Sequence, residues 1–137
     1  MKANLGSLAL VLLGIPLVLW MGRDLPWTFA HQAGLILLPA GAIFLIVARI
    51  QLGTAFSVRA KGTHLVTTGL YARIRNPIYV FGGVALAGGI LWFNRPFYLL
   101  VFVALIPMQV LRARKEGEVL QERFGAAYEE YRRGTWF

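Results

Sequence analysis

Two arginines and an Asn-Pro step stand directly before a long apolar run in the segment "GLYARIRNPIYVFGG", residues 69–83. Arg73 and Arg75 carry guanidinium groups, which pair bidentately with carboxylates and similar anions. Pro77 allows a helix to begin just after Asn76, and the free N–H groups of its first turn favour an anion at the same place. The segment is therefore a candidate anion site, although arginines beside an apolar run also serve as interfacial anchors.

A carboxylate with an unusual setting lies in the segment "RARKEGEVLQERFGAAYEEYRRGTWF", residues 112–137. Glu116 stands in line, at helical spacing, with an apolar stripe that is expected to share one face: Leu120, Phe124, Ala127 and Tyr131. Gly125 predicts a break or bend after Phe124. Arg112 precedes Glu116 by four residues, so a helix-surface ion pair of about 0.3–0.5 kcal/mol is the alternative role for this carboxylate.

The composition limits what the whole chain can be. With 137 residues it is predicted to form one domain, and 58% hydrophobic residues are more than an ordinary soluble domain carries. Cysteine is absent, and His31 and His64 are far apart in the sequence, so no metal site is predicted. A formal charge of +8 indicates nucleic acid, a membrane surface or an anionic ligand as partner.

Four apolar runs dominate the sequence, at 5–21, 34–48, 78–93 and 96–111. A helix needs about 20 residues to cross the hydrocarbon core, with a range of roughly 17–25. We predict an all-α integral membrane protein, residues 1–137 forming a single membrane domain with about four transmembrane helices at about 5–21, 25–50, 77–93 and 96–111. The first run resembles a signal peptide in following Lys2, but its length favours a retained helix.

The placement of basic residues predicts the orientation. If the amino terminus is cytoplasmic, twelve of the fourteen Lys and Arg residues lie inside and only Arg23 and Arg95 lie outside. The inner set comprises six residues after Leu111 together with Lys2, Arg49, Arg59, Lys61, Arg73 and Arg75. The segments 51–76 and 112–137 are then cytoplasmic, the first a loop with short elements and the second a C-terminal amphipathic helix. This bias explains the positive charge without nucleic acid, for which no binding motif is present.

Together the two cytoplasmic segments resemble a known family over about residues 65–131. The sequence "GLYARIRNPIY", a hydrophobic hairpin and "EGEVLQERFGAAYEEY" follow, in order and spacing, the pattern of the isoprenylcysteine carboxyl methyltransferase and phospholipid methyltransferase superfamily. Asn76 replaces the histidine of the eukaryotic enzymes, a variant typical of small bacterial members. Gly117 replaces the second glutamate of the pattern, which leaves Glu116 without its neighbour unless Glu118 compensates.

The resemblance implies S-adenosylmethionine as the cofactor. Arg75 or Arg73, with Asn76, suits its carboxylate, and Glu116 suits its ammonium group or ribose. Arg75 and Glu116 are the predicted catalytic residues. The predicted cofactor-binding residues are Tyr71, Arg73, Arg75, Asn76, Pro77, Tyr79, Glu116, Phe124 and Tyr128.

The protein is also expected to transfer the methyl group to a lipophilic acceptor that enters from the bilayer. We predict an integral membrane protein of the bacterial inner membrane, with both termini cytoplasmic as the basic residues indicate. The carboxylate of a prenylated cysteine is favoured by the basic inner surface, and a phospholipid amine is the alternative. Two further alternatives are an NADPH-dependent protein resembling sterol reductases and a small membrane protein without catalysis. The sequence does not indicate the oligomeric state.

Overall fold

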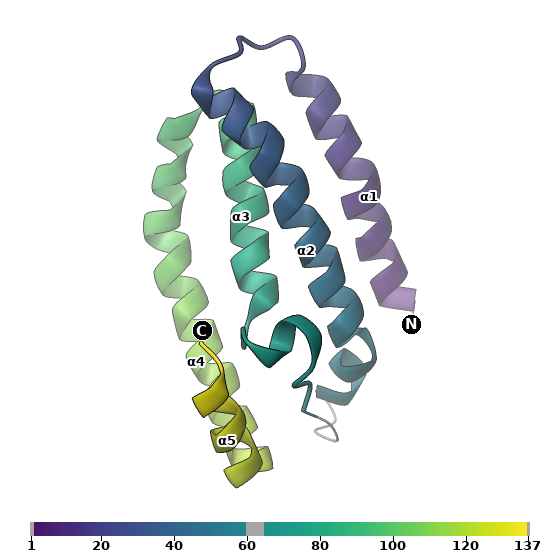
Figure 1. Cartoon of the computed structure of the whole chain (residues 1–137), viewed down its shortest axis with the longest axis vertical. Helices are drawn as coiled ribbons and strands as arrows, with labels where there is room; N and C mark the ends of the chain where they lie inside the picture. The colour runs from purple at the N-terminus through teal and green to yellow at the C-terminus, as the bar shows by residue number, and fades with distance from the viewer. Residues whose placement is uncertain (1, 60–64, 137) are drawn as a thin grey trace. The chain divides into compact units, whose positions relative to one another are not determined.

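The computed structural model describes residues 2–59 and 65–136, so the predicted cytoplasmic Lys61 and His64 lie outside the described residues. Its described parts are helical, apart from connecting segments and one isolated bridge (Figure 1). In chain order the elements are α1 (Lys2–Gly22), α2 (Phe29–Arg59), the 3₁₀ turn η1 (Gly69–Ala72), α3 (Pro77–Trp92), η2 (Pro96–Leu100), α4 (Val101–Phe124) and α5 (Ala126–Gly134). The all-α class is confirmed.

The chain divides into two compact units. Unit 1 contains Met1–Ile46 and Ile78–Val101, and therefore α1, the first part of α2, and nearly all of α3. Unit 2 contains Val47–Pro77 and Phe102–Phe137, and therefore the end of α2, η1, nearly all of α4, and α5. The single domain expected for residues 1–137 stays a prediction.

Two of the described helical segments are long and apolar enough to cross a membrane. They are Phe29–Leu52 and Pro96–Phe124, and two further apolar helices, Leu8–Gly22 and Pro77–Trp92, are shorter. At a rise of about 1.5 Å per residue, a 16-residue helix such as α3 spans about 24 Å, less than the roughly 30 Å of a hydrocarbon core. The four predicted spans thus stay a prediction.

The start of α2 is set by a side chain rather than by the apolar run. The hydroxyl of Thr28 accepts a hydrogen bond from the backbone N–H of His31 at 3.2 Å, which is the N-cap arrangement. The helix therefore begins at Phe29, four residues later than predicted. It also continues to Arg59, so the first nine residues of the predicted loop 51–76 are helical.

The fourth predicted helix does not end at residue 111. After η2, α4 runs from the apolar run into the charged segment as far as Phe124, because its Arg, Lys, Glu, Leu and Gln residues all favour helix. Gly125, with φ of +51°, adopts a backbone conformation that side-chain-bearing residues avoid, and the break predicted there is confirmed. The predicted single stripe is wrong beyond Phe124, since Ala127 and Tyr131 belong to α5. A cytoplasmic amphipathic helix stays a prediction.

Within unit 1, α2 and α3 pack with their backbones in contact. A β-carbon added at Gly88 of α3 would lie 2.6 Å from the Cα of Leu38, and one added at Gly41 of α2 would lie 2.8 Å from the Cα of Ala85. Such distances leave room only for hydrogen atoms. Small residues allow this approach, which favours helix association in lipid.

A buried histidine joins the ends of these helices in unit 1. His31 is fully buried and its ring stacks on Trp92, with centroids 3.8 Å apart. Its Nδ1 lies 2.6 Å from the carbonyl oxygen of Trp92, and the indole N–H of Trp92 donates to the carbonyl of Val18 in α1 at 2.9 Å. The same side chains thereby connect α1, α2 and α3.

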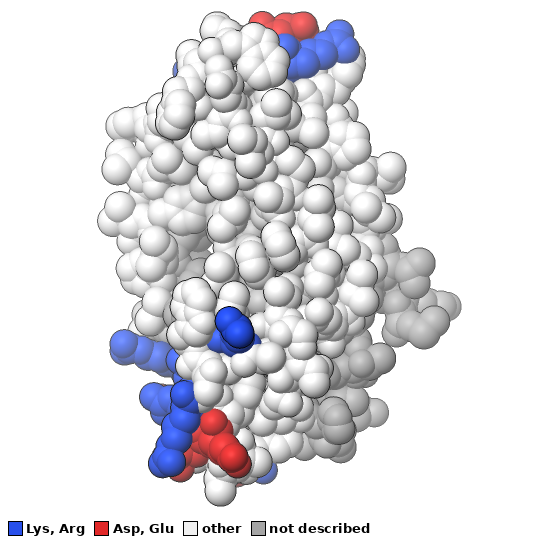
Figure 2. All heavy atoms as spheres, viewed as in Figure 1, with Lys and Arg blue, Asp and Glu red and all other residues white. Residues whose placement is uncertain are grey.

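Large apolar side chains cover much of the helices' outer surface. Leu10, Leu13, Phe97 and Val103 are each more than 70% exposed, and none of the apolar window of the Pro96–Phe124 span is buried. In Figure 2 the visible face of unit 1 shows few charged side chains, whereas those of unit 2 gather over the end of α4 and over α5. An apolar surface of this extent favours contact with lipid rather than water.

Candidate functional site

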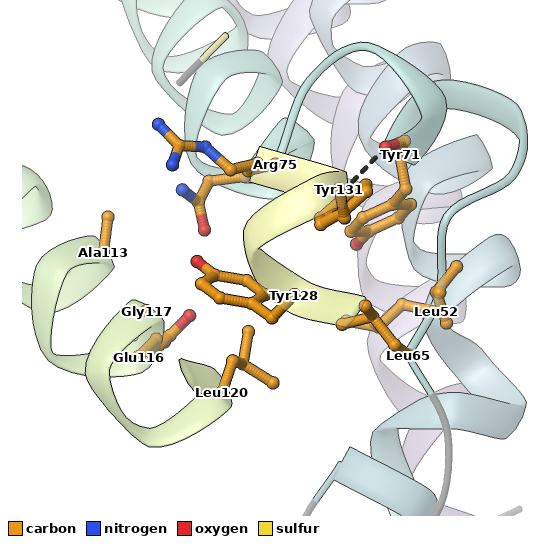
Figure 3. A pocket seen from close by; sticks show the side chains of 12 residues that line it. Leu52, Leu65, Tyr71, Arg75, Ala113, Glu116, Gly117, Leu120, Tyr128 and Tyr131 are labelled. Carbon is orange, nitrogen blue, oxygen red and sulfur yellow. Dashed lines mark hydrogen bonds between the residues drawn. The ribbon is translucent and has the colours of Figure 1, made fainter. Parts of the chain in front are cut away.

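A cavity in unit 2 brings together five of the predicted site residues (Figure 3). It has about 440 Å³ of empty volume, which includes space open to solvent. The predicted residues that line it are Tyr71, Arg75, Asn76, Glu116 and Tyr128. They come from three separate parts of the chain, namely η1 with the segment after it, α4, and α5. Their convergence is a finding, while their binding roles stay predictions.

Arg75 is the cation of this cavity. Its side chain is half-buried, and its Nε is fully buried without a hydrogen-bond partner among the described residues. Leaving a buried donor without an acceptor costs about 1–3 kcal/mol, and more when the group is charged. The Nε of Arg75 therefore lacks an acceptor, which an anionic group would supply.

Four predicted site residues do not line the cavity. Arg73 is exposed and Phe124 is the half-buried last residue of α4. Pro77 is buried as the first residue of α3, and Tyr79 lies farther along that helix, in unit 1. Of the two arginines predicted to bind the cofactor carboxylate, only Arg75 lines the cavity, so the geometry favours Arg75.

The segment that carries Tyr71 forms hydrogen bonds with α2 and with the C-terminal part of unit 2. The amide oxygen of Gln51, in α2, accepts from the backbone N–H of Leu70 at 2.8 Å. The hydroxyl of Tyr131, in α5, donates to the carbonyl oxygen of Tyr71 at 2.7 Å, and the N–H of Trp136 donates to that of Arg73 at 3.0 Å. This bracing fixes the backbone directly before Arg75.

Tyr131 is a site residue that was not predicted. It lines the cavity one helical turn after Tyr128, and the two rings lie 6.2 Å apart. The Tyr-x-x-Tyr spacing of residues 128–131, which is part of the family pattern, could have indicated Tyr131. The apolar part of the lining, which carries no chemical motif, was also missed: Leu52, Leu65, Val66, Ala113 and Leu120.

The glycine that departs from the superfamily pattern lies against Tyr128. A β-carbon at Gly117 would be 3.0 Å from the Tyr128 hydroxyl oxygen, closer than nearly all real contacts of that kind. A side chain there would require the Tyr128 hydroxyl to shift by a few tenths of an ångström, so the glycine leaves room for this hydroxyl at its present position. Glu118 is exposed and outside the lining, which gives no support for a compensating role.

Metal chemistry has no ligand set in the part of the chain that the structure describes. There, no group of three or more His, Cys, Asp or Glu side chains lies close enough to hold an ion. The polar side chains of the cavity instead offer one guanidinium, one carboxylate, an amide and phenol hydroxyls. Such a set suits an organic ligand with both an anionic and a cationic group.

Apolar helices of spanning length and a cavity that presents polar side chains occur together in this chain. The chain belongs to the phospholipid methyltransferase family, whose model matches residues 29–127. This family is part of the isoprenylcysteine and phospholipid methyltransferase superfamily, so the predicted resemblance is confirmed. No curated protein and no solved structure matches the chain.

The matched region contains most of the cavity. Tyr71, Arg75, Asn76 and Glu116 fall within residues 29–127, whereas Tyr128 lies directly after them. Membership of the family, together with two apolar helices of spanning length, makes the protein a membrane protein of a methyltransferase family. The cofactor, the acceptor and the orientation go beyond this finding.

Proposed function

We propose that the protein transfers a methyl group from S-adenosylmethionine to a lipophilic acceptor. The observation that carries the proposal is the buried, unpartnered Nε of Arg75 in a cavity that also presents Glu116. The cofactor carries a carboxylate and an ammonium group on one carbon, so it needs a cation and an anion close together. The family match supports the same reaction class.

Each polar group of the cavity has a role in this proposal. Arg75 and Asn76 bind the carboxylate, since a guanidinium and an amide both donate hydrogen bonds. Glu116 accepts from the ammonium group or from the ribose hydroxyls. Tyr71 and Tyr128 offer aromatic faces to the adenine. The empty volume of the cavity includes space open to solvent, so binding of the whole cofactor requires the lining to move apart.

The chain's own contribution to the reaction is then alignment. When bound, the cofactor supplies a methyl group already activated on a sulfonium. Arg75 and Glu116 hold the donor from two sides, and the apolar lining, including Leu52 and Leu120, excludes water. Holding donor and acceptor in line is worth several kcal/mol of the barrier, roughly 7–11 kcal/mol in well-oriented systems.

Two observations favour different acceptors. The charge of +8 favours an anionic head group such as the carboxylate of a prenylated cysteine. The family description names phospholipids, which favours a lipid amine. Both have an apolar tail, and the exposed apolar helix surfaces offer it a path from the bilayer.

Thermal melting in detergent tests the cofactor assignment. S-adenosylhomocysteine at about 100 times its Kd is expected to stabilise the folded protein by about 2.7 kcal/mol, because it binds only the native state. NADPH, the cofactor of the sterol-reductase alternative, is expected to leave the melting temperature unchanged. Stabilisation by NADPH alone would replace the proposal with that alternative, and no response to either ligand would favour a protein without catalysis.

We further propose four spans with both termini on the cytoplasmic side. In this topology the two shorter apolar helices, Leu8–Gly22 and Pro77–Trp92, also cross the membrane. The basic residues after Leu111 then lie on the cytoplasmic side. Reporter fusions at Lys2 and Phe137 are both expected to be active only in the cytoplasm. Activity of one fusion on each side would leave an odd number of spans and reject this topology.

A further inference from the structure

One polar side chain stands in the apolar half of α4. Between Leu99 and Leu111 every residue except Gln109 is apolar. The side-chain oxygen of Gln109 is fully buried and has no hydrogen-bond partner within the described residues. A buried amide oxygen without a donor costs about 1–3 kcal/mol, so its presence in this run requires a reason.

Gln109 lies on the face of α4 that forms the cavity wall. Among the less exposed positions of α4, one series recurs at steps of three and four residues: Phe102, Leu105, Gln109, Ala113, Glu116 and Leu120. The last three of these line the cavity. Gln109 does not itself line the cavity. One helical turn rises about 5.4 Å, so Gln109 stands one turn before the lining residue Ala113 on the same helix face, toward the apolar end of the helix.

A purely structural role does not account for the oxygen. Pro107, two residues earlier in α4, has no N–H and leaves the carbonyl of Val103 without its usual helical donor. An amide oxygen cannot pair with that carbonyl, because both are acceptors. The oxygen therefore needs an N–H or O–H donor from elsewhere.

We propose that Gln109 is the residue that selects the acceptor, by accepting a hydrogen bond from the amine head group of a lipid. The proposal rests on the proposed function, and it decides between the two acceptors. A carboxylate has no proton to donate at neutral pH, so its oxygens would face another oxygen. An amine retains an N–H for Gln109 while its lone pair faces the methyl group.

The reaction balances on this arrangement. The amine nitrogen attacks the methyl carbon, the carbon–sulfur bond breaks, and its electron pair stays on sulfur, which becomes a neutral thioether. At neutral pH the lipid amine is an ammonium ion, so it releases one proton to solvent before the attack, and the product nitrogen is again a cation that keeps its protons. Gln109 remains bound to an N–H of the product.

The test compares Gln109→Leu with Gln32→Leu, using dodecylamine and dodecanoate as probes. Leucine keeps approximate volume and removes the amide. Gln32 is an exposed glutamine of α2 with one long bond, 3.5 Å to the Trp27 carbonyl, and serves as the matched control. Melting temperature, probe-induced stabilisation and turnover of phosphatidylethanolamine are measured for both variants and the wild type, with S-adenosylhomocysteine binding alongside.

In Gln109→Leu, we expect dodecylamine affinity to fall about tenfold and the KM for phosphatidylethanolamine to rise about tenfold. The affinity for S-adenosylhomocysteine and all properties of Gln32→Leu stay unchanged. The ligand-free variant is expected to melt no lower than the wild type, since leucine leaves no unpartnered polar atom.

Three results would overturn the proposal. A lower ligand-free melting temperature with unchanged amine affinity would make Gln109 a structural residue. Loss of dodecanoate rather than dodecylamine affinity would show that the amide binds a carboxylate through its NH₂ group. Equal amine affinity in wild type and variant would remove Gln109 from the site. Failure of the wild type to bind S-adenosylhomocysteine would instead refute the proposed function. The difference in dodecylamine affinity between the wild type and Gln109→Leu would still test whether Gln109 binds an amine.

Discussion

Arg75→Ala is expected to weaken the binding of S-adenosylhomocysteine by about 10- to 150-fold. The substitution removes a charge-assisted hydrogen bond, worth about 1.5–3 kcal/mol, from the carboxylate of the ligand. Because Nε of Arg75 is buried without a partner in the described protein, its removal leaves no protein acceptor unsatisfied. The loss therefore appears in affinity, while the ligand-free protein is expected to melt at the same temperature or higher.

Arg73→Ala is the matched control for this prediction. The two arginines are two residues apart, yet the Arg73 side chain is exposed and does not line the cavity. Its structural contact is made by its backbone carbonyl, which alanine retains. Calorimetry in detergent is expected to give an affinity within about twofold of wild type. Equal losses in both variants would indicate a general effect of basic charge and would reject Arg75 as the specific ligand.

The polar half of the site could be predicted from the sequence because its residues occur in local motifs. Arg75 and Asn76 stand next to a proline at a helix start, and Glu116 interrupts an apolar stripe. Each of these signals lies within a few residues of chain. These motifs identified side chains that line the cavity, but they did not predict how far apart the side chains lie in the folded protein.

The rest of the site depends on contacts that the sequence does not encode locally. The hydrogen bond from Tyr131 to the carbonyl of Tyr71 joins residues 60 positions apart, and the one from Leu70 to Gln51 joins residues 19 positions apart. Only folding brings such pairs together. For the same reason Tyr79, which the motif suggested, lies outside the lining, and Leu52, which no motif suggested, lies within it.

Helix boundaries show the same division between local and distant causes. The break at Gly125 follows from the residue's own conformational freedom and was predictable. The start of α2 at Phe29 follows from the Thr28 cap, a local signal that the apolar pattern concealed. A helix was predicted after Leu111, but as a separate element, because the loss of hydrophobicity was interpreted as the end of the apolar helix. The helix α4 is continuous there, since helix propensity does not change at that point.

The glycines of α3 are the strongest test of how unit 1 is held together. At Gly88 a β-carbon would meet the backbone of α2, 2.7 Å from the carbonyl carbon of Leu37, and a backbone cannot rotate aside as a side chain does. At the next residue, Gly89, the nearest atom to a β-carbon is a methyl of Leu38 at 3.9 Å, an ordinary contact. Two adjacent glycines in one helix thus have opposite surroundings.

We therefore expect Gly88→Ala to destabilise the protein by about 1–3 kcal/mol or more, because α2 and α3 must separate to admit the methyl group. Gly89→Ala should stabilise it by up to about 1 kcal/mol, since alanine favours helix over glycine and here meets no obstacle. Thermal or denaturant unfolding in detergent measures both, and each variant carries the same chemical change. If the two variants unfold alike, the close approach of α2 and α3 at Gly88 is wrong, and the glycines serve chain flexibility rather than packing.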